Sequence, residues 1–183
     1  FLAWLLPSLV VLEPEISQVV RLTPRTAENS KNIVVRVIDD NGASLERPHV
    51  ALYCGDIVEE AEPEDGIAGF DIGLGVTCLA AVSAEGHLPV QKTLTSSVEQ
   101  TIILHKASSS NSGVIVIETF DNQDNSLAGV DVALFLDGKP LGIAKQTGID
   151  GTAKLEHLPL GAITAKASTT GFEGEAVVTV EPV

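Results

Sequence analysis

The chain repeats itself, and this repeat constrains its fold more than any other feature. With a shift of 82 positions and no gap, residues 33–53 (IVVRVIDDNGASLERPHVALY) fall on residues 115–135 (IVIETFDNQDNSLAGVDVALF). After a small change in length the match resumes, where residues 65–68 (DGIA) meet residues 150–153 (DGTA). Because the agreement covers both turns and strand-like runs, the sequence predicts two copies of one structural module.

The repeat divides the chain into four expected segments. Residues 30–106 and 112–183 form the two modules, and residues 107–111 (ASSSN) form a short polar linker. Residues 1–29 precede the first module. Within them, residues 18–22 (QVVRL) stand one repeat before residues 100–104 (QTIIL), so we expect residues up to about 24 to be the tail of a preceding unit.

The first residues of the chain, Phe1 to Leu12, are apolar and contain the lone tryptophan, Trp4. This run is shorter than the roughly 20 residues of a membrane helix, and Pro7 interrupts it. No basic residue precedes it and no small-residue cleavage site follows it, unlike a signal peptide. We expect a processed chain or a fragment, in which this run is a membrane stub, a core strand of a preceding unit, or a donor strand for a neighbouring subunit.

The composition and the periodicity both indicate an all-β protein. Aromatic residues make up only 4% and methionine is absent, whereas the β-branched residues that favour strands are plentiful. Residues 130–136 (VDVALFL) alternate with the period of two that a half-buried strand shows. Short strands at regular spacing, without helical periodicity, predict tandem Ig-like (transthyretin-like) β-sandwich modules of about seven strands each, with a barrel as the alternative.

Four motifs of the second copy follow one another in an order that known families share. They are residues 126–132 (SLAGVDV), 147–152 (TGIDGT), 158–161 (LPLG) and 170–172 (TGF). The pattern resembles the carboxypeptidase regulatory-like, transthyretin-like and collagen-adhesin B-type repeats. The resemblance implies a β-sandwich that serves as a stalk, spacer, adhesin or accessory domain.

The adhesin branch of these families joins a lysine on the first strand to an asparagine on the last strand by an isopeptide bond. In the second copy the expected first strand, residues 114–120, has no lysine, and the last, residues 174–183, has no asparagine. In the first copy Lys31 precedes the first strand, but no asparagine lies near residues 101–104. We therefore do not expect the isopeptide crosslink in either copy.

The strong negative charge excludes several partners. The chain has 11 basic and 25 acidic residues and a net charge of −14. A surface of this sign repels nucleic acids and anionic lipids. It suits an extracellular, salty or calcium-rich setting, but a solvated acidic surface kept for solubility is the simpler interpretation.

The only two cysteines, Cys54 and Cys78, lie in the first copy. The repeat places them opposite Leu136 and Ile163, at positions that the period of two turns inward. One interpretation is a disulfide across the sandwich, which implies an oxidising, extracellular setting. The other is a pair of free, buried thiols that act as small apolar fillers.

Two acidic runs are weak candidates for calcium binding, because calcium prefers loops rich in oxygen ligands. Their residues are Glu59, Glu60, Glu62, Glu64, Asp65, Asp121 and Asp124. Neither run has the ligand spacing of a known calcium loop, and a solvated acidic turn is the simpler interpretation.

We expect no catalytic or cofactor-binding residue and therefore no enzyme. The four histidines lack metal-ligand spacing, and the chain has no nucleophile elbow, phosphate loop or paired-carboxylate site. The sequence predicts an extracytoplasmic structural protein, made of spacer or assembly modules of a cell-surface or filament-forming protein. Its expected partners are further protein modules or copies of itself, with membrane anchoring through the N-terminal segment or residues outside the chain.

The alternative function is a carbohydrate- or protein-binding accessory module of a larger enzyme or membrane complex. The low aromatic content gives little material for an exposed aromatic platform of the kind that carbohydrate binding uses.

Overall fold

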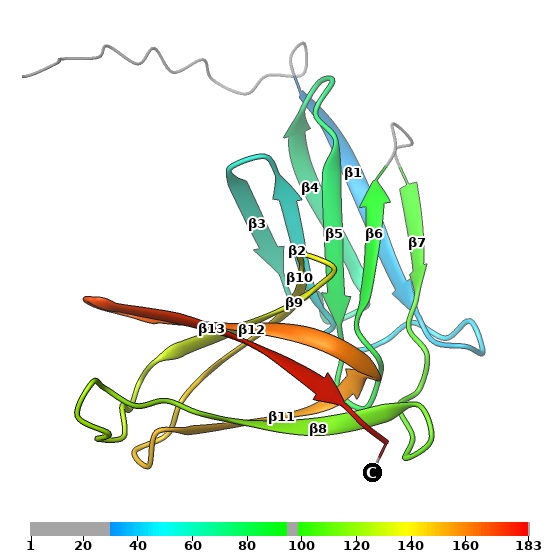
Figure 1. Ribbon diagram of the computed structural model, residues 1–183. Helices are drawn as coiled ribbons and strands as arrows, with labels where there is room; N and C mark the ends of the chain where they lie inside the picture. Colours follow the sequence, from blue (N-terminus) through cyan, green and yellow to red (C-terminus); the bar gives the residue numbers. More distant parts are fainter. Residues whose placement is uncertain (1–29, 95–98, 183) are drawn as a thin grey trace, which may run out of the picture.

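A computed structural model describes residues 30–94 and 99–182, and all regular elements within these ranges are β-strands (Figure 1). The strands of the first half form two sheets, with the orders β4-β1-β7 and β3-β2-β5-β6. These strands are β1 (Ser30–Ile38), β2 (His49–Cys54), β3 (Ile57–Ala61), β4 (Ile67–Gly73), β5 (Cys78–Ser83), β6 (Val90–Leu94) and β7 (Glu99–Ile103). The predicted all-β fold class is confirmed.

The strands of the second half form two further sheets, with the orders β10-β9-β12-β13 and β11-β8. They are β8 (Ser112–Glu118), β9 (Asp131–Leu136), β10 (Lys139–Gln146), β11 (Thr152–Pro159), β12 (Gly161–Thr169) and β13 (Phe172–Val180). Between the halves, the expected linker 107–111 is a hydrogen-bonded turn, in which the Ser108 N–H donates to Asn111 Oδ1 at 2.7 Å.

Each half encloses its own apolar core between its two sheets. In β1 the side chains of Ile33, Val35 and Val37 are completely buried, whereas the alternate residues Val34 and Arg36 are half-buried on the outer face. This alternation is what the pleat of a strand with one face in a core imposes. The core of the first half draws residues from both of its sheets, so the architecture is a sandwich and not a barrel.

The repeated Asp-Gly pair marks a close crossing of the chain in each half. Gly66 has a φ of +73°, and a Cβ there would lie 2.6 Å from the carbonyl oxygen of Leu45. Its counterpart Gly151 has a φ of +75°, and a Cβ there would lie 3.0 Å from the carbonyl oxygen of Thr119. Only glycine combines this backbone conformation with so little space, which explains why both copies keep it.

The molecule is bent, because the strands of the two sandwiches run in different directions (Figure 1). The β9–β10 hairpin of the second sandwich packs against the first sandwich. None of the described segments forms a helix that is long and apolar enough to cross a membrane. The apolar run Phe1 to Leu12 lies outside the described residues.

Candidate functional site

The two cysteines are bonded to each other, with an Sγ–Sγ distance of 2.03 Å. Cys54 ends β2 and Cys78 begins β5, and these strands are antiparallel neighbours in one sheet, with Tyr53 opposite Leu79. Of the two interpretations of the sequence, the disulfide is the one present, but the bond joins adjacent strands of one sheet and does not cross the sandwich as expected. The period of two shows that both residues point inward, but it does not show which strands are neighbours.

The second sandwich places an apolar pair where the first has its cysteines. Thr164 lies opposite Phe135 in the pairing of β12 with β9, so the adjacent residues Ile163 and Leu136 come next to each other. Ile163 is buried in the core, and Leu136 packs against it. The cysteine pair and the apolar pair thus occupy the same position in the two copies.

The acidic run at residues 59–65 is not a single loop, contrary to the prediction. Glu59 and Glu60 lie on β3, which pairs with β2 and turns successive side chains to opposite faces. Glu62 Oε1 lies 3.5 Å from His49 Nδ1. Asp65 Oδ1 accepts a hydrogen bond from the Ile67 N–H at 3.1 Å, and Glu64 is exposed. These five carboxylates do not converge on one point.

The second acidic run is a turn that Asp121 holds together. Its Oδ1 accepts hydrogen bonds from the backbone N–H groups of Gln123, at 2.8 Å, and Asn125, at 2.9 Å. The Asn125 side chain also donates to Asp121, and these hydrogen bonds lower the pKa of the Asp121 carboxyl. Asp124 lies in the same turn with a positive φ of 61°.

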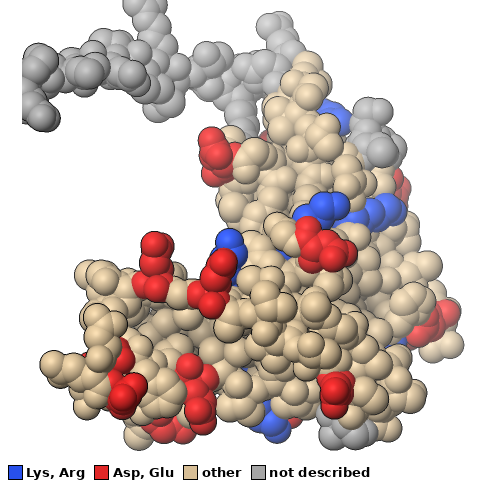
Figure 2. All heavy atoms as spheres, viewed as in Figure 1, with Lys and Arg blue, Asp and Glu red and all other residues tan. Residues whose placement is uncertain are grey.

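No group of three or more metal-ligating side chains occurs within residues 30–94 and 99–182. Figure 2 shows the acidic side chains spread over both sandwiches on the visible face. The calcium candidates therefore stay unsupported predictions.

The feature that the repeat did not predict is a tight interface between the two sandwiches. Ala51 on β2 and Ala81 on β5 lie directly opposite each other in the first sandwich, and both are completely buried. Their neighbours on each strand fill the core of the first sandwich, so the two alanines point to the outer face of the sheet. Something outside this sandwich must cover them.

The covering element is β10 of the second sandwich. Its pairing with β9 is irregular between Pro140 and Ala144, and Gly142 in this bulge has a φ of +67°. A Cβ at Gly142 would lie 3.1 Å from the Ala81 methyl group. Two alanines and a glycine thus bring the two backbones close together, because larger side chains would hold them apart.

Hydrogen bonds fix the orientation of this contact. The Gln91 side chain of the first sandwich donates to the carbonyl oxygens of Lys139 and Pro140, both at 2.8 Å. The Ser83 hydroxyl donates to the Gly142 carbonyl at 3.3 Å. The acceptors are backbone carbonyls at the bulge, so they cannot move independently of β10.

A cavity of about 380 Å³ lies beside this contact, between the two sandwiches. His49, Tyr53 and Glu60 line it from the first sandwich, and residues of β9 and β10 line it from the second. Burial raises the pKa of the Tyr53 hydroxyl, and the negative charge of Glu60 raises it further by a smaller amount. The cavity therefore has a polar side, which includes a carboxylate, and a largely apolar side.

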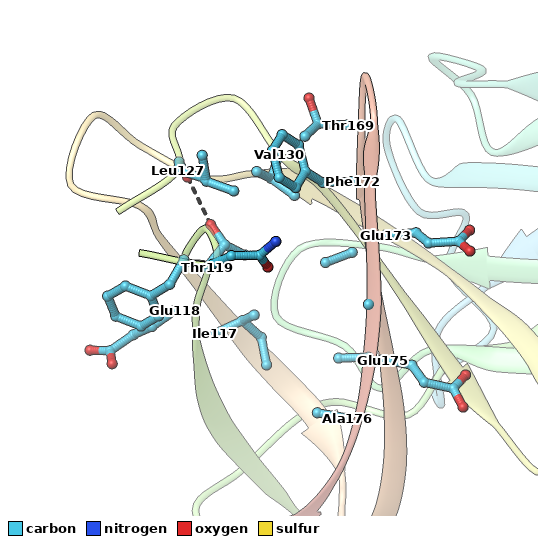
Figure 3. Close-up of a pocket in the computed structure, with 15 residues that line it drawn as sticks. Ile117, Glu118, Thr119, Leu127, Val130, Thr169, Phe172, Glu173, Glu175 and Ala176 are labelled. Carbon is cyan, nitrogen blue, oxygen red and sulfur yellow. Dashed lines mark hydrogen bonds between the residues drawn. The ribbon is translucent and has the colours of Figure 1, made fainter. Parts of the chain in front are cut away.

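A groove of about 280 Å³ opens between β8 and β13 of the second sandwich (Figure 3). In this view Ile117 of β8 points toward β13, whereas Glu118, Glu173 and Glu175 point away from the groove. The Thr119 hydroxyl is held by the Leu127 carbonyl at 2.7 Å. The floor is therefore mostly apolar, and the acidic side chains lie at its rims.

Comparisons with known proteins identify no family. No family model matches the chain, and a search of curated proteins finds no match. The similarity to the carboxypeptidase regulatory-like, transthyretin-like and collagen-adhesin families is therefore one of motif order alone.

Several solved structures are similar to this chain. The Bacillus anthracis TIE protein is 18% identical with a TM-score of 0.36, over 84% of this chain and 32% of that one. The Streptococcal ancillary pilin is 12% identical with a TM-score of 0.35, over 86% and 61%. GBS52, the minor pilin of Streptococcus agalactiae, is 15% identical with a TM-score of 0.33, over 83% and 91%. At these identities and TM-scores the similarities carry no functional argument.

Proposed function

We propose that this chain is a non-enzymatic, extracytoplasmic structural protein whose two sandwiches form one rigid unit of a cell-surface or filament-forming protein. The observation that carries the proposal is the interface where Ala51 and Ala81 are completely buried and the backbone of Gly142 lies close to Ala81. Two modules that only shared a tether would not need to bury an outward-facing alanine pair. A spacer or assembly unit needs this fixed geometry.

Three further observations support the same function. The bonded cysteines suit an oxidising compartment outside the cytoplasm. The three hydrogen bonds to carbonyls of β10 fix the orientation of the two sandwiches, which apolar contact alone would not do. The turn at 107–111 keeps the connection short, so little chain is free between the modules.

Small-angle X-ray scattering of the purified chain tests the proposal. We expect the wild-type scattering to fit one bent shape, and Ala81→Glu to broaden the distribution of interatomic distances, because a buried carboxylate forces the two faces apart. Ala162→Glu is the matched control, since Ala162 lies exposed on β12. Wild-type scattering that already requires two independently moving sandwiches would overturn the proposal.

A further inference from the structure

The cavity between the two sandwiches has an aromatic side chain on each wall. Tyr53 of β2 lines it from the first sandwich, and Phe135 of β9 lines it from the second. The repeat aligns these two residues, so one cavity contains the equivalent aromatic side chain of both copies. Both are half-buried, and part of each ring stays accessible. The hydrogen bonds from Gln91 and Ser83 to β10 hold the walls in a fixed orientation, so the cavity is preformed.

Glu60 adds a negative charge to the wall of the first sandwich. In the pairing of β2 with β3, Tyr53 lies opposite Val58. Glu60 stands two residues beyond Val58, so it is the diagonal neighbour of Tyr53 on the outer face of the sheet. The carboxylate is close enough to raise the pKa of the Tyr53 hydroxyl. An aromatic ring, a hydroxyl group and a carboxylate thus stand side by side on this wall.

The electrostatic potential of the cavity favours a cation. Among the described residues, no lysine or arginine lines the cavity. Its histidine, His49, has Nδ1 3.5 Å from Glu62 Oε1. The whole chain carries a net charge of −14. A positively charged ligand is therefore attracted to the cavity, and an anion is repelled.

The Phe135 ring already contacts a cation of its own chain. Lys166 Nζ lies 5.0 Å from the centre of this ring. A cation within about 6 Å of a ring centre is attracted by the electron density of the ring face. Lys166 is exposed and comes from β12, where Thr164 lies opposite Phe135. The Phe135 ring is therefore accessible to a positive charge from the outer face of its sheet.

We propose that the cavity binds an arginine side chain of a partner protein. Its guanidinium group meets the Glu60 carboxylate, and its aliphatic part packs between Tyr53 and Phe135. Arginine fits better than lysine, because the planar guanidinium group forms two parallel hydrogen bonds with a carboxylate and stacks on aromatic rings. The cavity, of about 380 Å³, has the size of a small-ligand pocket.

The inference goes beyond the proposed structural function and rests on it. The two walls belong to different sandwiches, so they form one cavity only while the sandwiches keep a fixed orientation. An arginine side chain bound between them would stabilise this orientation, because it contacts both walls.

A titration of the isotope-labelled full chain with N-acetyl-arginine methylamide, followed by two-dimensional NMR, tests the inference. We expect saturable shifts of backbone amide signals on both walls, in β2, β3 and β9. N-acetyl-citrulline methylamide is the matched probe, since a neutral urea group of similar shape replaces the guanidinium group. We expect it to bind at least about tenfold more weakly. Equal binding of the two probes, or no saturable shift, would overturn the inference.

Variants of the two walls locate the bound side chain. Glu60→Gln keeps the shape of the side chain and removes its charge, so we expect the affinity for the arginine probe to fall at least about tenfold. Asp56→Asn is the matched control, because Asp56 lies exposed in the turn of the same hairpin and does not line the cavity. Equal affinities of these two variants would contradict the contact with Glu60.

The second wall gives variants with opposite effects. We expect Phe135→Leu to weaken binding, because it removes the ring. Lys166→Met is expected to strengthen binding, because it removes the competing cation from the same ring. A merely structural effect of these substitutions would not raise the affinity. Unchanged affinity in both variants would exclude Phe135 from the site and overturn the inference.

The ligand site and the rigid unit fail separately. A chain that scatters as one bent shape and does not bind the arginine probe refutes the ligand site and leaves the rigid unit intact. Scattering that requires independently moving sandwiches refutes the rigid unit. Shifts confined to β2 and β3 would show binding to the first sandwich alone and refute a site between the two.

Discussion

At the scale of single residues, the acidic side chains that look most like ligands are turn anchors. Asp39 and Asp121, which the repeat aligns, each accept two backbone N–H groups through Oδ1, those of the second and fourth residues that follow. The side chain thus replaces backbone partners that the turn cannot supply. Asp65 and Asp150 form a second aligned pair and each accept the N–H two residues later.

The hydrogen bonds that these turn-anchoring aspartates accept predict how the stability of the fold depends on pH. Backbone hydrogen bonds lower the pKa of Asp39 and Asp150, and hydrogen bonds from Asn125 and Gln123 lower that of Asp121. A carboxyl whose pKa is lower in the folded state stabilises the fold above its ordinary value of 3.8, and this contribution is lost as the pH falls through the lowered pKa. We therefore expect the melting temperature to fall as the pH drops below about 4.

Asp121 gives the matched pair of variants for that prediction. Asp121→Asn keeps an oxygen that accepts both N–H groups, whereas Asp121→Ala leaves them without the side chain. We expect Asp121→Ala to melt a few degrees lower at neutral pH, and Asp121→Asn to melt close to wild type with a weaker acid dependence. Thermal unfolding followed by circular dichroism measures both, and an unchanged melting temperature in Asp121→Ala would contradict the anchoring role.

At the scale of strands, the sequence predicts where a strand lies along the chain better than which strands pair with each other. The alternation at residues 130–136 locates β9, because a half-buried strand leaves its period in the sequence. The strand β3 was missed, since Ile57–Ala61 contains two glutamates and its side chains are largely exposed. The connection of Cys54 to Cys78 and the covered alanines depend on which strands meet, and no local pattern encodes that.

The same limit applies to the candidate site. Ala51 and Ala81 look like ordinary strand residues, and their role appears only when β10 lies over them.

The cysteine pair gives a prediction about neighbouring strands. Thiol titration of the denatured, unreduced protein is expected to find no free thiol, and two free thiols would contradict the bond. Replacing both cysteines with alanine removes a crosslink between residues 24 apart, which in the chain-entropy estimate lowers the free energy of unfolding by about 3 kcal/mol. Urea unfolding of the first sandwich measures this loss.

The second sandwich offers the complementary experiment. Because Leu136 and Ile163 occupy the equivalent neighbouring positions, Leu136→Cys with Ile163→Cys in a chain without Cys54 and Cys78 is expected to form a disulfide on oxidation. Leu134→Cys with Ile163→Cys is the control, since Leu134 lies opposite Ala165 and not beside Ile163. Equal crosslinking of both pairs would show that the two copies do not share the register of these strands.

At the scale of the whole molecule, the two copies of the repeat have come to differ in their outer faces. The face that carries Ala51 and Ala81 in the first sandwich carries Ala133 and Lys166 in the second, and Lys166 lies exposed with its Nζ 5.0 Å from the centre of the Phe135 ring. A lysine at this position prevents the close backbone contact that an alanine permits. The first sandwich is therefore the one adapted to receive a β10 bulge, and the bend of the molecule follows from this difference.

Substitutions at two glycines of the β9–β10 hairpin distinguish the effect of the interface contact from the effect of backbone strain. Gly142→Ala and Gly138→Ala both place a side chain at a positive φ, +67° and +75°, which costs about 1–2 kcal/mol in either case. Only the new methyl group at Gly142 meets Ala81, whereas nothing lies within 4 Å at Gly138. We expect both variants to melt at lower temperature, and only Gly142→Ala to change the scattering profile of the folded chain. An unchanged profile in Gly142→Ala would mean that the bend of the molecule does not depend on this contact, and identical changes in the two variants would attribute it to the hairpin alone.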